Sequence, residues 1–121
     1  MSAKRILIAD DNMASRELIR EVLESSGYEV IEAADGEEAL AGVRRDAPDL
    51  MLVDIQMPRL DGYQVLRELR SEPRFHDLQI VALTAFAMHG DRERALEAGF
   101  DGYITKPVEI AALREEIRKL L

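Results

Sequence analysis

Charged or hydroxyl-bearing side chains directly follow four mostly apolar segments of this sequence. The segments are residues 6–9, 50–53, 79–83 and 103–105, and the side chains after them are Asp10, Asp11, Asp54, Thr84 and Lys106. An unpaired charge is unstable inside a sheet, so each of these groups is expected at the mouth of a strand and not within it. They are the first candidates for chemistry.

Carboxylates within a few ångströms of one another repel strongly unless a cation joins them. Oxygen ligands without His or Cys nearby favour a hard ion such as Mg²⁺. Three aspartates, one divalent cation and Lys106 together carry no net charge. Such a site would attract a phosphoryl group, to which Thr84 could donate a hydrogen bond. Asp54 is the candidate nucleophile, because carboxylates form aspartyl-phosphate intermediates.

The elements that must bring these residues together are predicted from the periodicity of apolar residues. We predict strands at residues 6–9, 28–33, 50–54, 79–83 and 103–105, and helices after Asn12, after Asp35, at 62–70, at 91–98 and from Ile110. Strands that alternate with helices over short connections form one parallel sheet, an α/β doubly wound fold. The carboxyl ends of parallel strands share one edge, so the candidate side chains should converge there.

The predicted helices differ in how clearly their ends and apolar sides are marked. Asn12 is a candidate N-cap of the first helix, and Asp35 with Glu38 resembles a capping box for the second. The apolar side predicted for the first helix consists of Leu18, Ile19, Val22 and Leu23. The helix at 91–98 has little apolar surface, which predicts weak anchoring to the sheet.

The composition indicates a single globular domain, residues 1–121, with no output domain. The 121 residues are 47% hydrophobic and 33% charged and include no cysteine, which excludes disulfides and cysteine chemistry. A net charge of -8 argues against direct binding to nucleic acid. The sequence has no stretch of about 18–20 apolar residues and no signal peptide before Ile6, so we expect no membrane contact and a cytoplasmic location.

Five short motifs, in this order and spacing, resemble the receiver domain of two-component response regulators over essentially the whole chain. The motifs are Asp10-Asp11, Asp54 to Pro58, Asp61-Gly62, Thr84-Ala85 and Lys106-Pro107. The resemblance implies a flavodoxin-like fold with strand order 2-1-3-4-5. Residues 84–88 and 90–94 resemble those of single-domain receivers of the DivK kind and of receivers fused to hybrid histidine kinases.

The resemblance implies a phosphoacceptor and a metal site. Asp54 would accept the phosphoryl group. Asp11, Asp54 and the backbone carbonyl of Gln56 would ligate Mg²⁺ or Mn²⁺, while Asp10 would hold a metal-bound water. The domain would then catalyse its own phosphorylation and would not be an ordinary enzyme acting on a separate substrate.

The resemblance also implies how phosphorylation is read out. Lys106 would bridge to the phosphoryl group, and Thr84 with Tyr103 would form a switch pair. Tyr103 is expected to turn inward from the surface and so reshape the face formed by the fourth helix, the fifth strand and the fifth helix, where a downstream protein target would bind. The Lys106–Pro107 bond is implied to be cis, an isomer that proline tolerates.

The implied phosphoryl donor is a histidine kinase or a histidine phosphotransfer protein. It would dock on Ala14, Ser15 and Leu18 near the rim of the site, although the periodicity also allows Leu18 to be a core residue. The lifetime of the phosphoryl group would depend on Gln56, which could orient a water, and on Phe86, which offers no polar partner and would shield the site. We therefore expect slow autodephosphorylation.

Two other functions fit parts of the pattern. A phosphatase of the haloacid dehalogenase type needs a second Asp two residues after its nucleophile, where this chain has Gln56. A flavin phosphate would meet Asp10-Asp11 where a hydroxyl- and glycine-rich loop is required, and neither a Walker loop nor G-x-G-x-x-G is present.

His76 and His89 are lone residues in polar surroundings and are interpreted as surface residues.

Overall fold

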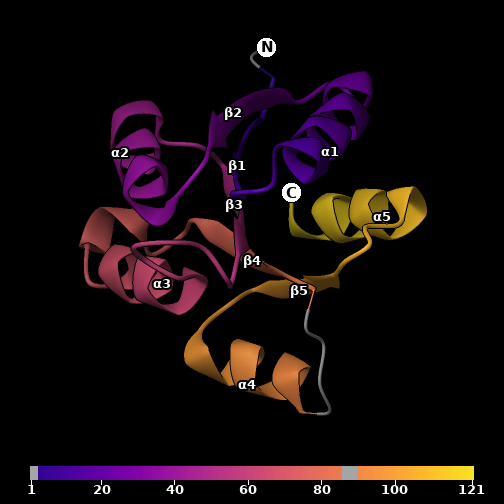
Figure 1. The fold of residues 1–121 in the computed structure, drawn as a ribbon. Helices are drawn as coiled ribbons and strands as arrows, with labels where there is room; N and C mark the ends of the chain where they lie inside the picture. Colours follow the sequence, from indigo (N-terminus) through magenta and orange to yellow (C-terminus); the bar gives the residue numbers. More distant parts are fainter. Residues whose placement is uncertain (1–2, 86–89) are drawn as a thin grey trace.

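A computed structural model describes residues 3–85 and 90–121, in which strands alternate with helices along the chain (Figure 1). The strands are β1 (Arg5–Ala9), β2 (Glu29–Ala33), β3 (Leu50–Asp54), β4 (Gln79–Thr84) and β5 (Gly102–Thr105). The helices are α1 (Met13–Ser25), α2 (Gly36–Asp46), α3 (Gly62–Arg70), α4 (Asp91–Ala98) and α5 (Ile110–Leu120), with a short 3-10 helix η1 (Pro73–Phe75). The predicted alternation is confirmed.

The five strands form one parallel sheet with the order β2-β1-β3-β4-β5. This confirms the predicted doubly wound fold and its strand order. The more polar strand β2 lies at one edge of the sheet and β5 at the other. The order reverses between β1 and β3, and in open α/β sheets ligands bind outside the carboxyl ends of the strands at such a point.

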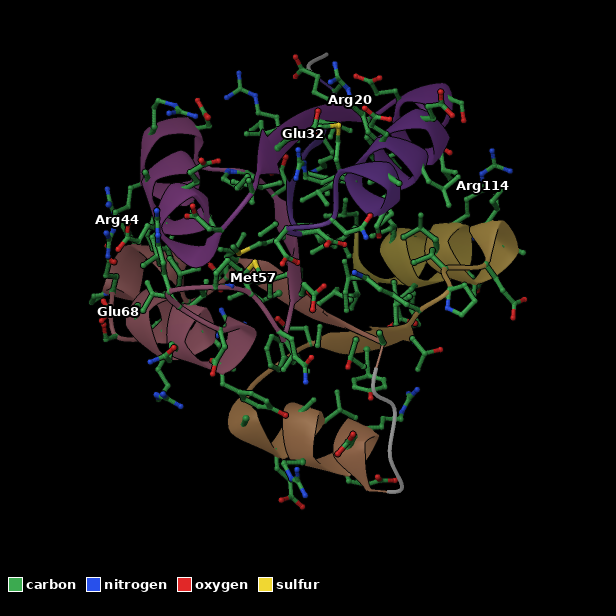
Figure 2. All side chains as sticks on the ribbon, in the orientation of Figure 1. Arg20, Glu32, Arg44, Met57, Glu68 and Arg114 are labelled. Atoms are coloured by element: carbon green, nitrogen blue, oxygen red, sulfur yellow. The ribbon has the colours of Figure 1, made fainter. Side chains whose placement is uncertain are left out.

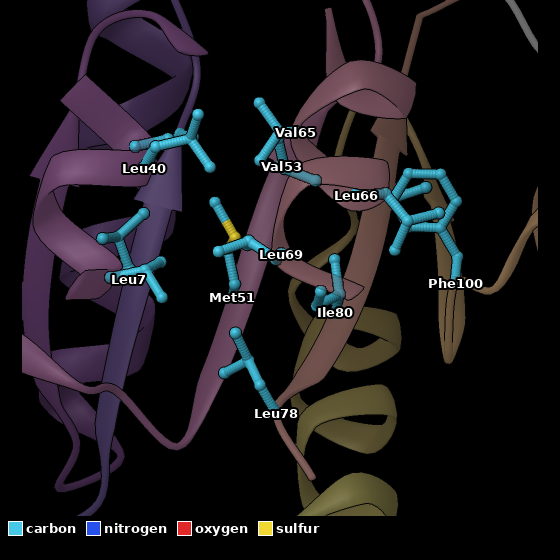
Figure 3. Close-up of a cluster of buried hydrophobic side chains, with 14 of the residues drawn as sticks. Leu7, Leu40, Met51, Val53, Val65, Leu66, Leu69, Leu78, Ile80 and Phe100 are labelled. Carbon is cyan, nitrogen blue, oxygen red and sulfur yellow. The ribbon is translucent and has the colours of Figure 1, made fainter. Parts of the chain in front are cut away.

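Helices cover both faces of the sheet, α1 and α5 on one and α2, α3 and α4 on the other (Figure 1). Because successive side chains of a strand point to opposite faces, interior strands with two covered faces must be apolar throughout. Figure 3 shows the core under α2 and α3, where side chains from three strands meet the helices. The residues labelled there are Leu7, Leu40, Met51, Val53, Val65, Leu66, Leu69, Leu78, Ile80 and Phe100.

Side chains cap the amino-terminal ends of the first three helices. The Asn12 side chain accepts a hydrogen bond from the Ser15 N–H, which confirms it as the cap of α1. Asp35 caps α2 through the Glu38 N–H, but the Glu38 carboxylate accepts from the N–H of Ala34, so the predicted capping box is displaced by one residue. A complete capping box, which the sequence analysis did not identify, opens α3 at Asp61.

The rotation of α1 against the sheet separates residues that the periodicity grouped together. Ile19 and Leu23 are fully buried and Val22 is nearly so, whereas Leu18 is 43% exposed. Leu18 is therefore a surface residue, and the core alternative for it is wrong. In α4 only Ala95 is buried, which confirms that this helix has little apolar surface; its weak anchoring stays a prediction.

The helices are short. The longest in the described ranges, α1, has 13 residues, whereas a membrane-spanning helix needs about 20. Within residues 3–85 and 90–121, no helix combines the length and the apolar character needed to cross a membrane.

Candidate functional site

The carboxyl edge of the sheet brings together the side chains that the sequence singled out. Asp10 follows β1, Asp54 ends β3, Thr84 ends β4 and Lys106 follows β5. These four strands are consecutive neighbours in the sheet, so residues far apart in the chain lie side by side. The predicted convergence is confirmed.

Three carboxylates form the centre of this site. Asp10, Asp11 and Asp54 each place a carboxylate oxygen within 4.8 Å of the other two. Asp10 has no exposed surface and Asp54 has 6%, whereas Asp11 is exposed to solvent. The Asn12 N–H donates a hydrogen bond to Asp10 Oδ1 at 2.9 Å. An all-oxygen donor set with one open side fits a hard divalent cation.

The Lys106 ammonium joins two of these carboxylates. Its Nζ lies 2.7 Å from Asp54 Oδ2, with which it makes a hydrogen bond, and 2.7 Å from Asp10 Oδ2, with which it makes an ion pair without hydrogen-bond alignment. The Lys106 N–H donates to the Thr84 carbonyl at 2.8 Å, which fixes this residue against the end of β4. The Lys106–Pro107 bond is cis, as predicted.

Burial and charge act in opposite directions on the two central groups. Burial raises the pKa of the Asp54 carboxyl above its ordinary value, despite hydrogen bonds from Lys106 and from the Gln56 N–H that favour the charged form. Burial alone would lower the pKa of Lys106, but its contacts with Asp10 and Asp54 outweigh burial and raise that pKa. The ammonium is therefore charged at neutral pH, and the site is built around a cation.

The loop between β3 and α3 holds the Asp54 carboxylate from the other side. The Gln56 N–H donates to Asp54 Oδ1 at 2.8 Å, and the Gly62 N–H donates to the Ile55 carbonyl at 2.8 Å. A Cβ on Gly62 would lie 2.8 Å from the Asp54 carbonyl oxygen and 2.8 Å from Ile55 Cα. Gly62 belongs to the Asp61-Gly62 motif of the sequence, but only the structure shows that its missing side chain lets α3 approach the residue after the carboxylate.

We expect Gly62→Ala to disturb Asp54 without touching its side chain. The new methyl meets backbone on both sides, so the loop must move, which lowers the free energy of unfolding by about 1–3 kcal/mol. Phosphorylation of Asp54 by acetyl phosphate should slow as well. Urea unfolding and intact-mass spectrometry measure the two effects.

Gly27→Ala is the control, because a Cβ there meets nothing within 4 Å, although its φ of +95 makes the change strained. It should lower stability while leaving the rate of phosphorylation unchanged. A phosphorylation rate that is normal in Gly62→Ala would contradict the role given to this glycine.

The two candidate switch residues are both buried. Thr84 is 3% exposed and Tyr103 is 9% exposed, and the Tyr103 hydroxyl has no hydrogen-bond partner among the described residues. The expectation that the Tyr103 ring starts at the surface is wrong. Alternation along β5 points Tyr103 to the face that α4 covers and Ile104 to the opposite face.

Two further sequence predictions concern residues 86–89. Phe86, which was predicted to shield the site, and His89 lie outside the described residues. His76 is exposed, as predicted for a surface residue.

A groove of about 400 Å³ lies beside the carboxylates. Its lining comprises Asn12, Ala14, Ser15, Leu18, Ala85, Lys106, Pro107 and Val108. The structure thus brings the three predicted docking residues of α1 into one concave surface with Lys106. A second groove, of about 360 Å³, lies between α4, β5 and α5 and includes Arg92, Tyr103 and Glu116.

The family model for the response regulator receiver domain matches residues 6–118. The polar-differentiation response regulator DivK of Brucella anthropi is 39% identical over 118 residues, which cover 98% of this chain and 96% of that protein.

Solved structures give the same relationship. A putative response regulator from Chloroflexus aurantiacus superimposes with a TM-score of 0.93 at 34% identity, covering 98% of both chains. The receiver domain of sensor histidine kinase PA1611 from Pseudomonas aeruginosa, described with a magnesium ion coordinated in its active site cleft, gives 0.89 at 37% identity and the same coverage.

Proposed function

The chain belongs to the response regulator receiver domain family of two-component signalling, and from this premise we propose that Asp54 is its phosphoacceptor. Phosphorylation is the general chemistry of the family. The observation that supports Asp54 is its place at the mouth of β3, in contact with Lys106 and close to Asp10 and Asp11.

The proposed reaction transfers a phosphoryl group from a phosphohistidine or from acetyl phosphate. An Asp54 carboxylate oxygen forms the new O–P bond while the bond between phosphorus and the donor breaks. With phosphohistidine an N–P bond breaks and its electron pair stays on the imidazole nitrogen, whereas with acetyl phosphate an O–P bond breaks and its electron pair leaves with acetate. The Lys106 ammonium stabilises the negative charge on the phosphoryl oxygens during the transfer, and the Thr84 hydroxyl donates a hydrogen bond to one of them. The Gln56 N–H keeps the carboxylate oriented during the transfer.

Receiver domains bind Mg²⁺ in their acidic pocket, and the residues of this chain fit such an ion. We propose Asp11, Asp54 and the Gln56 backbone carbonyl as its ligands, with Asp10 holding a metal-bound water, and Mn²⁺ as a substitute ion. The ion supplies positive charge for the phosphoryl oxygens when it is bound. Support comes from the three carboxylate oxygens within 4.8 Å of one another.

Receiver domains interact with histidine kinases and with downstream targets. For this chain we propose that the donor, a histidine kinase or a histidine phosphotransfer protein, docks in the groove formed by Ala14, Ser15 and Leu18 with Val108. Lys106, which contacts Asp54, also lines this groove. A helical donor bound there would hold its phosphohistidine near Asp54.

We expect Ala14→Glu to slow phosphoryl transfer from the donor protein by roughly tenfold or more, because an apolar contact surface gains an unpaired charge. Labelling by acetyl phosphate, which needs no docking, should stay at the wild-type rate. Rates from both donors, followed by intact-mass spectrometry, provide the comparison.

Ala41→Glu, on the exposed side of α2 and on the other face of the sheet, is the matched control and should change neither rate. If Ala14→Glu slows both reactions equally, the substitution damages the site and the docking surface lies elsewhere.

We propose that phosphorylation shifts the face formed by α4, β5 and α5, where a downstream target binds. Thr84 would be drawn toward the phosphoryl oxygens, and the space behind it would stabilise the inward Tyr103 ring already seen in this structure. The sparse apolar side of α4 leaves it weakly held, so a small free-energy difference can change its position.

Amide NMR spectra with Mg²⁺ and beryllofluoride, a phosphoryl mimic, test this switch. We expect chemical-shift changes from Thr84 through about Arg94 to Tyr103, and weaker changes beyond the site in Thr84→Ala. Changes confined to the neighbours of Asp54 in the wild type would exclude a switch on this face.

We also propose that autodephosphorylation is slow and that the residue types of Gln56 and Phe86 set its rate. We propose further that the domain works in the cytoplasm without direct contact to nucleic acid or membrane. The net charge of -8 supports the absence of nucleic-acid binding.

A further inference from the structure

The side chain of Arg16 reaches from α1 to the loop that carries the acidic pair. Its Nη1 donates a hydrogen bond to the backbone carbonyl of Asp10 at 2.8 Å, and its Nε donates to Glu32 Oε1 at 3.0 Å. The side chains of Arg16 and Glu32 are 15% and 26% exposed. A guanidinium withdrawn from water to this extent requires both partners, so its position is well determined.

The carbonyl that Arg16 holds belongs to the peptide group between Asp10 and Asp11. Asp10 is fixed independently, because its carboxylate is held by the Asn12 N–H and by Lys106. The Asp11 side chain is exposed and makes no hydrogen bond or ion pair with any described residue. The direction of the Asp11 side chain therefore depends on the peptide group before it, which Arg16 restrains.

The positive charge of Arg16 is balanced by the carboxylate of Glu32, with which it forms an ion pair. Partial burial would raise the pKa of Glu32, but hydrogen bonds from Arg16 and Arg20 outweigh burial and hold that pKa below its ordinary value. Arg20 Nη1 lies 2.6 Å from Glu32 Oε2 (Figure 2). Arg20 also pairs with Glu24, at 3.2 Å, so the two arginines face two carboxylates. With both carboxylates ionised, Arg16 adds little net charge to the site, and its effect on the aspartates is mainly geometric.

We propose that Arg16 is a positioning residue for the metal site: by fixing the Asp10–Asp11 peptide group it aims the Asp11 carboxylate at the ion. The inference rests on the proposed function, because it requires that the three aspartates take up Mg²⁺. Groups that orient metal ligands typically contribute 10–100-fold to metal affinity. Arg16→Met should accordingly weaken Mg²⁺ binding by about tenfold.

Arg20→Met is the matched control. Arg20 lies one turn further along α1 and pairs with the same carboxylate of Glu32, so its removal makes the same change in charge. Among the described residues its side chain pairs with Glu24 and Glu32 and makes no hydrogen bond or ion pair with Asp10 or Asp11. Its loss should leave Mg²⁺ affinity unchanged.

Isothermal titration calorimetry with Mg²⁺ on the wild type, Arg16→Met, Arg16→Lys and Arg20→Met gives the affinities. Urea unfolding in EDTA and at one fixed Mg²⁺ concentration separates stability from metal binding, because a ligand of the native state raises stability by an amount set by its Kd. Arg16→Met should reduce the Mg²⁺-induced rise in the urea midpoint. Arg16→Lys keeps the positive charge but lacks the planar guanidinium that binds both Glu32 and the Asp10 carbonyl. Its affinity for Mg²⁺ should therefore lie between those of Arg16→Met and the wild type.

The outcomes separate the two proposals. If the wild type binds no Mg²⁺, the proposed metal site is wrong. If the wild type binds Mg²⁺ and both Arg16 variants bind it equally well, only the role of Arg16 is overturned, even where stability in EDTA has fallen. Equal weakening in Arg20→Met would assign the effect to charge and overturn the geometric role. Should Arg16→Met fail to fold, Arg16→Lys alone decides between these results.

Discussion

Asp54→Asn should abolish phosphorylation by acetyl phosphate, while the wild type gains the mass of one phosphoryl group in the presence of Mg²⁺. The amide keeps the size of the side chain and an oxygen for the Gln56 N–H, but it has no carboxylate to form the O–P bond. We expect the rate to fall at least about a hundredfold, which corresponds to about 2.7 kcal/mol in the barrier. Intact-mass spectrometry over time measures the rate of phosphorylation.

Asp77→Asn, a change of an exposed aspartate in the loop before β4, is the control and should label like the wild type. Excess EDTA should stop the labelling of both proteins that carry Asp54. Labelling of Asp54→Asn at the wild-type level would show that another residue accepts the phosphoryl group, and full labelling in EDTA would contradict the metal dependence.

Lys106→Met should destabilise the metal-free protein strongly. The change removes the ammonium that lies 2.7 Å from both Asp10 Oδ2 and Asp54 Oδ2, and it leaves two buried carboxylates facing each other. Removing one partner of a buried ion pair lowers the free energy of unfolding by about 3–5 kcal/mol. Because Asp54 can take up a proton, the lower end of that range is expected.

The pH dependence of this loss has a definite sign. The pKa of Lys106 is raised in the folded state, so its stabilisation is complete below the unfolded value of about 10.4 and disappears as pH rises through the higher folded value. Near neutral pH the wild type therefore keeps the whole contribution. In Lys106→Met, raising the pH ionises Asp54, whose pKa burial raises, and so lowers stability. The difference in stability from the wild type should therefore be larger at pH 8 than at pH 5.

Urea unfolding at pH 5 and pH 8, in EDTA and in saturating Mg²⁺, measures the loss of stability in Lys106→Met and its dependence on pH. Mg²⁺ should stabilise Lys106→Met more than it stabilises the wild type, because the ion supplies the positive charge that the variant lacks. Phosphorylation of Lys106→Met by acetyl phosphate should still be much slower than that of the wild type, because the variant has no ammonium to stabilise the charge on the phosphoryl oxygens. Lys119→Met, which removes an exposed lysine paired with Glu116 on α5, is the control. Similar losses in both variants would show that Lys106 has no special role.

The sequence by itself determined the sheet and the position of the chemistry on it. Continuous apolar runs form strands only where both faces are covered, and short helical connections allow only parallel strands. A carboxylate, hydroxyl or ammonium at the end of such a run must then lie at the shared carboxyl edge. For this reason Asp10, Asp54, Thr84 and Lys106 could be placed together before any contact was known, and the structure confirms it.

Only the tertiary structure decided contacts that depend on how the elements are rotated and how closely they approach. The helical period allowed Leu18 on either side of α1, and the packing of α1 left it in solvent. Tyr103 was expected outside, but the alternation of β5 and the covering by α4 place its ring inside. Two further contacts involve backbone atoms: Gly62 lies close to the backbone of Asp54, and Arg16 donates a hydrogen bond to the Asp10 carbonyl. A pattern of residue types cannot predict such contacts, because every residue has the same backbone atoms. Local periodicity specifies which element forms and which edge it ends on, whereas distances between backbones are set by the packing of the whole domain.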